Sequence, residues 1–194
     1  MDRLPELIDN LIAARRSVYP RDYTGERVDD ALIRRMLQNA NWAPNHKQTE
    51  PWRFVIYTGD GLKTLGEQQS RLYRQHAEMQ GNFSQEEYQK LLTKPLSASH
   101  IIAIGMTRDP QGFVPEIEEI GAVFCAIQNL YLSAHAYGLA CYLGTGGVTY
   151  YKESAPLFGF DRFIGFLYIG IPRPNLGLKG RRRPVEEKIS WVTR

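Results

Sequence analysis

The stretch that says most about the fold of this chain is Ala43-Pro44-Asn45-His46-Lys47-Gln48-Thr49-Glu50-Pro51-Trp52-Arg53-Phe54. It is a polar loop bracketed by two prolines, and it runs directly into an apolar segment typical of a buried strand. One predicted helix earlier lies Arg15-Arg16-Ser17, a cluster of two guanidinium groups and a hydroxyl. Such donors suit a phosphate, because an arginine fork can meet two of its oxygens at once. The two segments together predict a bound anionic cofactor beside a polar loop.

The bulk composition is that of a soluble domain. With 194 residues the chain can bury a substantial core, and we expect residues 1–194 to form a single domain. Hydrophobic residues make up 43% and charged residues 23%, as in globular proteins. No apolar run approaches the roughly 18 residues that span a bilayer, and the N-terminus lacks the apolar core of a signal peptide. We therefore expect a cytoplasmic protein without a membrane partner.

Residues that commonly carry enzyme chemistry are sparse. Metal-ligand spacing is absent from the four histidines, which are His46, His76, His100 and His135, so no metal site is predicted. No serine lies in a nucleophile elbow. Cys125 and Cys141 lie in apolar contexts, which predicts two buried, reduced thiols rather than a disulfide. A chain with binding features but few acids, bases or nucleophiles fits an enzyme whose cofactor does the chemistry, and we assign no catalytic side chain.

Hydrophobic periodicity predicts the helices. A first amphipathic helix begins near Leu4 and ends near Arg15, and Asp29 or Asp30 can cap a second one. A long helix covers about residues 116–137. It is apolar nearly all round, which predicts a central position and makes His135 a hydrogen-bonded core residue. The polar residues 62–92 are also helical in pattern, with a break at Gly81-Asn82, and they form a candidate mobile lid.

Short apolar runs predict three core strands, at Phe54–Tyr57, Ile101–Met106 and Phe163–Ile169. Residues 138–143 lead from the long helix into a glycine-rich turn, and Pro172 begins an irregular tail. Helices and strands interleave, and one connection is long and partly helical. The pattern predicts an α+β sandwich with a central mixed or antiparallel sheet flanked by helices.

Each candidate binding segment also has a plain structural interpretation. Arg15-Arg16-Ser17 follows a helix, where arginines can complement the negative end of the dipole. Asn45-His46-Lys47-Gln48 offers donors to an electron-rich heterocycle, or it is a polar surface loop. Gly144-Thr145-Gly146-Gly147 lets backbone N–H groups approach a ligand closely, or it is a turn. It is neither a P-loop nor a dinucleotide fingerprint. The basic run at residues 179–183 is solvated surface or a phosphate contact.

Taken together, these segments resemble the nitroreductase superfamily of FMN-dependent oxidoreductases. The resemblance spans nearly the whole chain. Its pieces, in chain order, are Arg15-Arg16-Ser17, the block from Ala43 to Phe54, the long apolar helix with Gln128-Asn129 and Gly138-Leu139, the turn Leu143-Gly144-Thr145-Gly146-Gly147, the strand end Phe166–Pro172 and the tail Arg181-Arg182-Arg183-Pro184.

The resemblance implies a nitroreductase-like homodimer with two FMN molecules at the subunit interface, which the long apolar helix would help to form. Arg15, Arg16 and Ser17 would hold the phosphate and the ribityl chain or pyrimidine edge. Arg182, with Arg181 as the alternative, would add a phosphate contact from the tail. His46 and Trp42 would reach the flavin, from the same chain or from the partner subunit. The residues expected against the isoalloxazine ring are Tyr142, Leu143, Gly144, Thr145 and Gly146.

The activity implied by the resemblance is ping-pong hydride transfer through flavin N5. NADH or NADPH would be the donor, and a nitroaromatic, a quinone or another electron-poor small molecule the acceptor. A flavin-dependent dehalogenase or dehydrogenase of the same fold is an alternative that the sequence does not separate. A non-enzymatic nucleic-acid-binding module using Arg181–Arg183 is a different class. It is disfavoured because the net charge is only +3 and the tail offers a single aromatic residue, Trp191.

Overall fold

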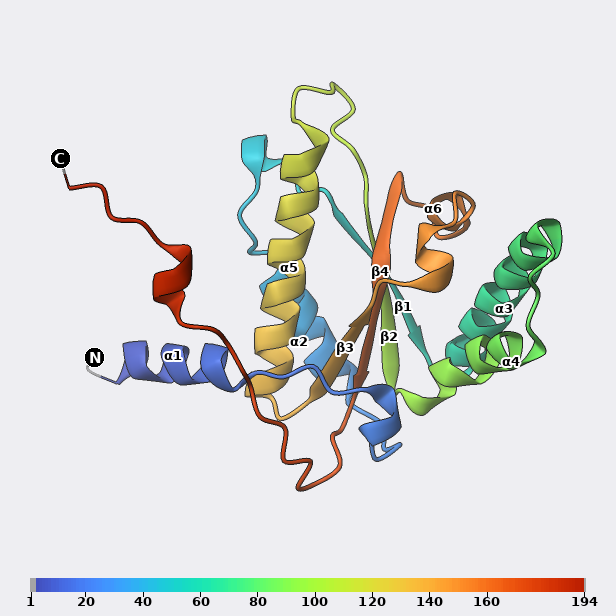
Figure 1. Ribbon diagram of the computed structural model, residues 1–194, viewed down its shortest axis with the longest axis horizontal. Coiled ribbons are helices and arrows are strands. Elements are labelled where there is room, and N and C mark those ends of the chain that lie inside the picture. Colours follow the sequence, from blue (N-terminus) through green and yellow to red (C-terminus); the bar gives the residue numbers. More distant parts are fainter. Residues whose placement is uncertain (1–2, 194) are drawn as a thin grey trace.

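The computed structural model describes residues 3–193, which form a four-stranded antiparallel sheet with helices on both faces (Figure 1). The sheet has the spatial order β1-β2-β4-β3, and every neighbouring pair is antiparallel. Its strands are β1 (Trp52–Thr58), β2 (His100–Met106), β3 (Ala140–Gly144) and β4 (Arg162–Gly170). The predicted α+β architecture is confirmed, and in the described residues the sheet is antiparallel rather than mixed.

Strand β3 was not predicted as a strand. The segment is only five residues long and lacks the polar and apolar alternation that marks a half-buried strand. It pairs with β4 alone and forms one edge of the sheet, while β1 forms the other. The fourth strand therefore depends on a long-range partner that a local pattern does not reveal.

Helices connect and cover the strands. They are α1 (Leu4–Ala14), α2 (Asp30–Ala40), α3 (Asp60–Gln80), α4 (Gln85–Thr93), α5 (Glu116–Ala136) and α6 (Ser154–Leu157). Asp29 caps α2 as predicted, because its side chain accepts a hydrogen bond from the Ala31 N–H at 2.8 Å. The predicted break near Gly81 is also confirmed, since Gly81 ends α3 with a φ of 68°.

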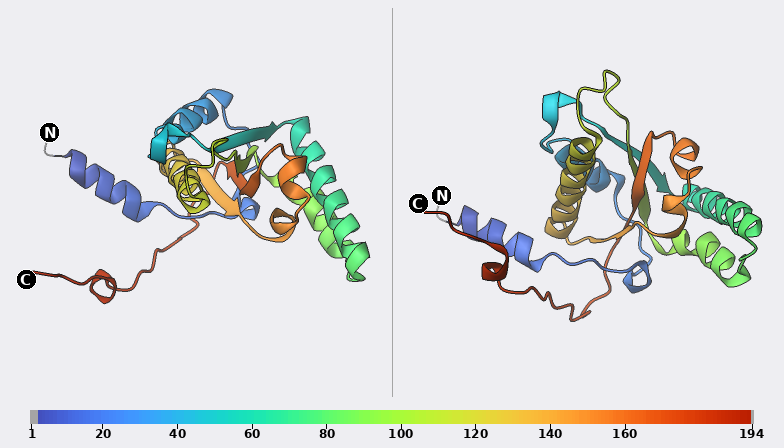
Figure 2. Two further views of the ribbon diagram at one scale, coloured as in Figure 1. Left: turned by 90° about the horizontal axis from the view of Figure 1, so that it is seen from above. Right: turned by 45° about the horizontal axis from the view of Figure 1, so that its top comes forward.

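The core has two layers, one on each face of the sheet (Figure 2). On one face α2 and α5 pack against side chains such as Ile102 and Leu167. On the other, α3 and the segment after β3 pack against Ile101 and Phe166. All seven residues of β2 are buried, because successive side chains enter opposite layers and both layers are apolar.

The interpretation of residues 62–92 as a mobile lid is not supported. Helix α3 buries Leu62, Leu65 and Leu72 against the sheet, and α4 packs along α3. The polar composition of this segment reflects its outer face, which is solvated. We conclude that α3 and α4 form a packed helical hairpin that covers one face of the sheet.

The long helix α5 is less enclosed than predicted. One side packs on α2 and the sheet, but Phe124 on the other side is 46% exposed and Cys125 beside it is also exposed. The prediction of two buried thiols is therefore wrong for Cys125 and correct for Cys141. His135 is only half-buried, so its placement in the core is wrong as well. Because α5 is apolar on nearly all sides, the sequence did not distinguish its exposed face from its buried one.

Both ends of the described chain project from the body (Figure 1). Helix α1 has no buried residue, and its apolar side chains Leu4, Leu7 and Ile12 are 61%, 63% and 52% exposed. The tail after β4 projects from the same side of the body as α1, and Trp191 near its end is 85% exposed. Among residues 3–193, no helix is long and apolar enough to cross a membrane.

His100 begins β2 as a buried polar side chain, with only 1% of its surface exposed. Its Nε2 lies 3.0 Å from Asp30 Oδ1, and its Nδ1 lies 3.0 Å from Ser99 Oγ. Burial lowers the pKa of His100, and the neighbouring Asp30 carboxylate only partly offsets this effect. The imidazole is therefore held neutral in the folded protein to a lower pH than in the unfolded chain.

We predict that the free energy of unfolding decreases as the pH falls below about 6.5, the ordinary pKa of histidine. In that range the unfolded chain binds a proton at His100 that the folded chain does not, so protonation favours unfolding. The loss ends once the pH is below the pKa of the folded state. Urea denaturation at about pH 7.5 and about pH 5.5 measures the effect. His100→Gln should flatten this dependence, whereas the control His76→Gln should keep it; an unchanged slope in His100→Gln contradicts the prediction.

Candidate cofactor site

The arginine segment lies along the free edge of β3. Val18 donates its N–H to the Cys141 carbonyl oxygen at 3.0 Å, which fixes residues 15–18 beside that strand. Arg15 ends α1 as its C-cap residue, and its guanidinium carbon lies 4.9 Å from the ring centre of Tyr131 on α5. Arg15 and Ser17 thus lie close to β3, which carries some of the residues expected against the ring, although the two segments are more than 120 residues apart in sequence.

Arg16 is oriented by backbone carbonyl groups and covered by the tail. Its Nη1 donates to the carbonyl oxygens of Ala13 and Arg15, at 2.7 and 2.8 Å. These contacts complement the C-terminus of α1, which is the structural interpretation of this arginine. Its Nε, however, is buried and has no hydrogen-bond partner within the described residues. The tail backbone at Gly180 lies directly against the Arg16 guanidinium, where a side chain in place of the glycine hydrogen would displace it.

The two tail arginines predicted to contact phosphate therefore follow directly after a residue that touches Arg16. Both Arg181 and Arg182 are exposed, and Arg182 Nη1 donates to the Arg181 carbonyl oxygen at 2.8 Å. Arg15 and Arg16 thus precede the residue that pairs with β3, and Arg181 and Arg182 follow Gly180, which lies against the Arg16 guanidinium. A buried guanidinium N–H without a protein partner is the kind of group that an oxyanion satisfies.

Tyr131 connects this cluster to the glycine turn. Its hydroxyl oxygen accepts a hydrogen bond from the Leu143 N–H at 2.7 Å, and the Ser17 side chain lies close enough to influence the same hydroxyl. Burial raises the pKa of Tyr131, so the phenol remains neutral at physiological pH. Ser17 and Leu143, predicted to contact opposite ends of one cofactor, thus both lie beside a single side chain.

Beyond Leu143 the chain borders a hollow of about 760 Å³. Leu143 and Thr145 line it on one side, and Phe124 of α5 and Phe163 of β4 line it on others. Pockets for organic ligands are typically of this size and are mostly apolar with a few polar groups. Of the residues predicted against the ring, Tyr142 and Gly144 lie immediately beside this hollow in β3, and Gly146 follows in the turn.

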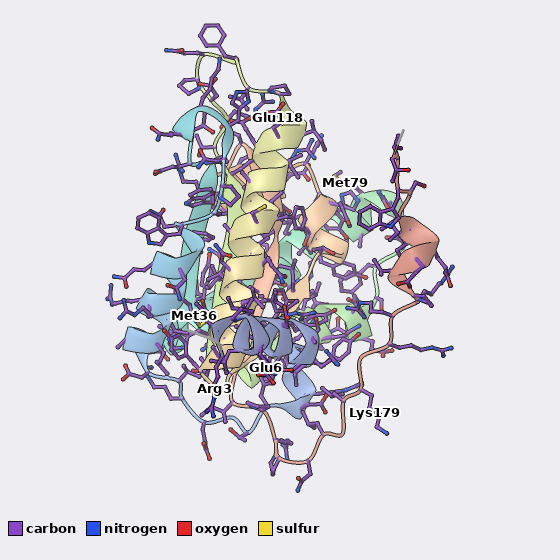
Figure 3. The ribbon with its side chains drawn as sticks, turned by 90° about the vertical axis from the view of Figure 1, so that its left-hand side faces the viewer. Arg3, Glu6, Met36, Met79, Glu118 and Lys179 are labelled. Atoms are coloured by element: carbon purple, nitrogen blue, oxygen red, sulfur yellow. The ribbon has the colours of Figure 1, made fainter. Side chains whose placement is uncertain are left out.

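Trp42 and His46 lie far from the arginines within one chain. His46 Nδ1 is 2.6 Å from Glu118 Oε2 in the first turn of α5 (Figure 3), whereas Arg15 contacts Tyr131 near the other end of that helix. Glu118 and Tyr131 are 13 residues apart on α5, or about 20 Å along its axis. Trp42 is 86% exposed and borders a separate hollow beside β1. These two side chains can join the arginines only if they come from another copy of the chain.

The loop that carries His46 has a strained backbone. Lys47, Gln48 and Glu50 adopt positive φ angles of 51°, 54° and 43°. Such conformations cost about 1–3 kcal/mol each and persist only where the surroundings impose them. Here Asn45 Oδ1 accepts the Glu50 N–H at 3.0 Å, and the Pro51 that follows is buried. The Asn45 contact within the loop and the buried proline at its end thus support this backbone conformation.

Sequence reasoning missed Lys94, which begins the short 3-10 helix Lys94–Ser97. Its ammonium lies 5.4 Å from the ring centre of Tyr142 and 4.9 Å from that of Tyr168. Burial lowers the pKa of Lys94, and repulsion by Lys90 adds to the effect. Among residues 3–193, Lys94 forms no ion pair with a carboxylate. A lysine at the end of a polar helix carries no sequence signal that would have revealed this position.

Comparison with known proteins places this geometry in context. The model of the nitroreductase family matches residues 12–171. The Escherichia coli K12 protein YdjA, named as an NAD(P)H nitroreductase, is 30% identical over 176 residues, covering 89% of this chain and 90% of YdjA.

Two solved structures have the same fold. A nitroreductase-like family protein from Bacillus cereus superposes with a TM-score of 0.78 at 31% identity, covering 96% of both chains. A Desulfovibrio desulfuricans protein described as a nitroreductase in complex with FMN has a TM-score of 0.68 at 22% identity, covering 95% of this chain and 96% of the other. The predicted resemblance is confirmed, and this chain belongs to the nitroreductase family.

Proposed function

We propose that this protein is an FMN-dependent oxidoreductase that uses NADH or NADPH to reduce an electron-poor small molecule, such as a nitroaromatic or a quinone. The observation that carries the proposal is the position of Arg15 and Arg16 beside β3, with the glycine turn and a hollow of mixed polar and apolar lining at the end of the same strand. The YdjA relative, named for the same activity, supports it. Residues 1–194 would act as a single FMN-binding domain.

The residues present fit a phosphate-bearing flavin. Arg15, Arg16 and Ser17 would hold the phosphate end, with the unpartnered Arg16 Nε as one available donor. Arg182, or Arg181, would close over the phosphate from the tail. The ring would lie against the β3 end and its turn, at Tyr142, Leu143, Gly144, Thr145 and Gly146. When bound, FMN would take two electrons from a reduced nicotinamide and pass them to the acceptor.

The protein contributes binding, orientation and charge rather than an acid or a base. Lys94 brings a positive charge to the Tyr142 side of β3, where it would stabilise negative charge that gathers on the ring. The neutral Tyr131 hydroxyl fixes the Leu143 backbone, so the turn keeps one shape. The apolar wall at Phe124 and Phe163 would exclude water from the acceptor. No side chain is required to react covalently.

The functional unit would be a homodimer. Trp42 and His46 lie too far from their own arginines to complete the same site. The exposed apolar side chains on α1 and α5, among them Leu7 and Phe124, would be covered by a second copy. In that arrangement His46 and Trp42 of one subunit would reach the flavin held by the arginines of the other.

For the phosphate role, we predict that Arg15→Ala combined with Arg16→Ala raises the dissociation constant of FMN by about 100-fold or more. Charge-assisted hydrogen bonds contribute about 1.5–3 kcal/mol each, so the loss of two arginines is large. Titration of the FMN-free protein, followed by flavin fluorescence, measures the constant. The control Arg21→Ala removes an exposed arginine near the same segment and should leave FMN affinity unchanged. Equal affinity in the double variant and the wild type would refute the role.

For the polar loop, we predict that His46→Ala lowers turnover mainly, with FMN content changing little. The imidazole lies away from the phosphate donors, so it would influence the acceptor side of the site. Steady-state assays with NADH or NADPH and a quinone, together with the flavin absorbance per protein, separate the two effects. Loss of most of the flavin in this variant would show instead that His46 is a cofactor-retention residue.

For the assembly, we predict that the wild-type protein sediments as a dimer and that Leu7→Glu combined with Phe124→Glu yields monomers. Placing charge in an apolar interface leaves it desolvated and unpaired. Analytical ultracentrifugation reports the mass, and Met79→Glu, at an exposed apolar position on α3, is the matched control. A monomeric wild-type protein at micromolar concentration would contradict the proposed assembly.

A further inference from the structure

A pair of tyrosine rings holds the Lys94 ammonium. Tyr142 of β3 and Tyr168 of β4 are direct cross-strand partners, so their side chains leave the sheet on the same face. Their ring centres are 6.1 Å apart. The Lys94 ammonium lies 5.4 Å from one centre and 4.9 Å from the other, within the range of cation–π attraction for both rings. We call Tyr142 and Tyr168 the aromatic seat.

The aromatic seat is built into the fold rather than formed by chance at the surface. Tyr168 is only 3% exposed, and Tyr142 is half-buried. Beneath them lies Gln69 of α3, 2% exposed, whose side chain faces the Tyr168 hydroxyl. The Gln69 amide nitrogen has no hydrogen bond of ordinary geometry within the described residues, so this contact is a loose one. Helix α3 thus packs against the buried Tyr168 ring through Gln69.

The chemistry of the aromatic seat differs from that of an ion pair. A carboxylate beside Lys94 would cancel its charge, whereas a tyrosine ring attracts the cation through its quadrupole and remains neutral. Burial raises the pKa of Tyr168, so its phenol carries no charge at physiological pH. Lys94 is therefore a partly desolvated cation that forms no direct ion pair among residues 3–193, and the carboxylate that acts on it, that of Glu87, lies beyond ion-pair distance.

We propose that Tyr142 and Tyr168 are positioning residues that hold Lys94, free of a direct ion pair among residues 3–193, beside β3, and that this cation raises the midpoint potential of bound FMN. The inference rests on the proposed FMN binding and adds to it the means of redox tuning. Two electrons bring negative charge to the ring, and a fixed cation nearby stabilises that charge. Tyr168 would act only through Lys94, whereas Tyr142 would also lie against the flavin ring, so the variants at Tyr168 are the decisive ones.

The test is the midpoint potential of bound FMN, measured by equilibration with a reference dye in the FMN-loaded protein. Lys94→Met should lower the potential by at least about 30 mV, which is a tenfold change for a two-electron couple. Tyr168→Leu should reproduce most of that shift, and Tyr168→Phe should not, because phenylalanine keeps the ring. Tyr168→Met, which also removes the ring, serves as a second variant should Tyr168→Leu fail to fold. In the Lys94→Met background, Tyr168→Leu should not lower the potential further.

A control and a direct readout of position accompany the potentials. Tyr57→Leu removes a half-buried tyrosine from the same face of the sheet without touching Lys94, and it should leave the potential unchanged. In NMR spectra, the Lys94 ε-protons should show an upfield ring-current shift that Tyr168→Leu reduces and Tyr168→Phe keeps.

The possible failures are distinguishable. A wild-type protein that takes up no FMN, seen from its absorbance spectrum, would end the proposed function and this inference together. A Tyr168→Leu variant that binds FMN with the wild-type potential would leave the function standing and overturn the aromatic seat. A Tyr168→Phe variant that behaves like Tyr168→Leu would also overturn it, because the hydroxyl rather than the ring would then be responsible.

Discussion

The free edge of β3 is the constraint on which the candidate site depends. An edge strand leaves one row of backbone groups unpaired, and here residues 15–18 use it through the hydrogen bond from Val18 to Cys141. This contact brings the end of α1 to the start of the glycine turn. Tyr131 then lies beside both Ser17 and Leu143 at the same junction. A cofactor lying along this edge would meet guanidinium donors at one end and backbone N–H groups at the other.

The same arrangement explains why a single chain looks incomplete. Residues 15–18 pair with β3, and α1 before them projects outward with its leucines exposed. Phe124 on α5 is likewise exposed, because α5 packs on the sheet with its opposite side. The polar loop at His46 is fixed to the far end of α5 by Glu118. A second copy would supply a cover for the apolar surfaces and a loop for the open side of the site.

Much of this fold could be predicted from local patterns, and the failures have identifiable physical causes. The core strands at Ile101–Met106 and Phe163–Ile169 are continuous apolar runs because both faces of the sheet are covered, and the cap at Asp29 follows from side-chain chemistry. Strand β3 could not be predicted, since its pairing with β4 is the only reason it is extended. Cys125 was misplaced because hydropathy does not distinguish a face buried in the core from one left for a partner. The grouping of Arg15–Ser17 with residues 142–146 came from a family resemblance, and the structure supplies its geometry. Lys94 could not be identified from the sequence, because the two rings that contact it come from β3 and β4, which are distant from it in the chain.

Two kinds of cation lie along the β3 edge, and their settings differ. The arginines are exposed or half-buried, keep much of their hydration and reach out with planar forks, which suits the capture of a permanent dianion. Lys94 is partly desolvated between two neutral rings and has no carboxylate partner among residues 3–193. Its charge acts over a short range through a medium of low polarity, where electrostatic interactions are stronger than at the surface. A charge placed in this way suits a group whose own charge changes during turnover, because stabilisation is needed when electrons arrive and not before. The arginines beside β3 would therefore retain the cofactor, whereas Lys94 would tune its midpoint potential.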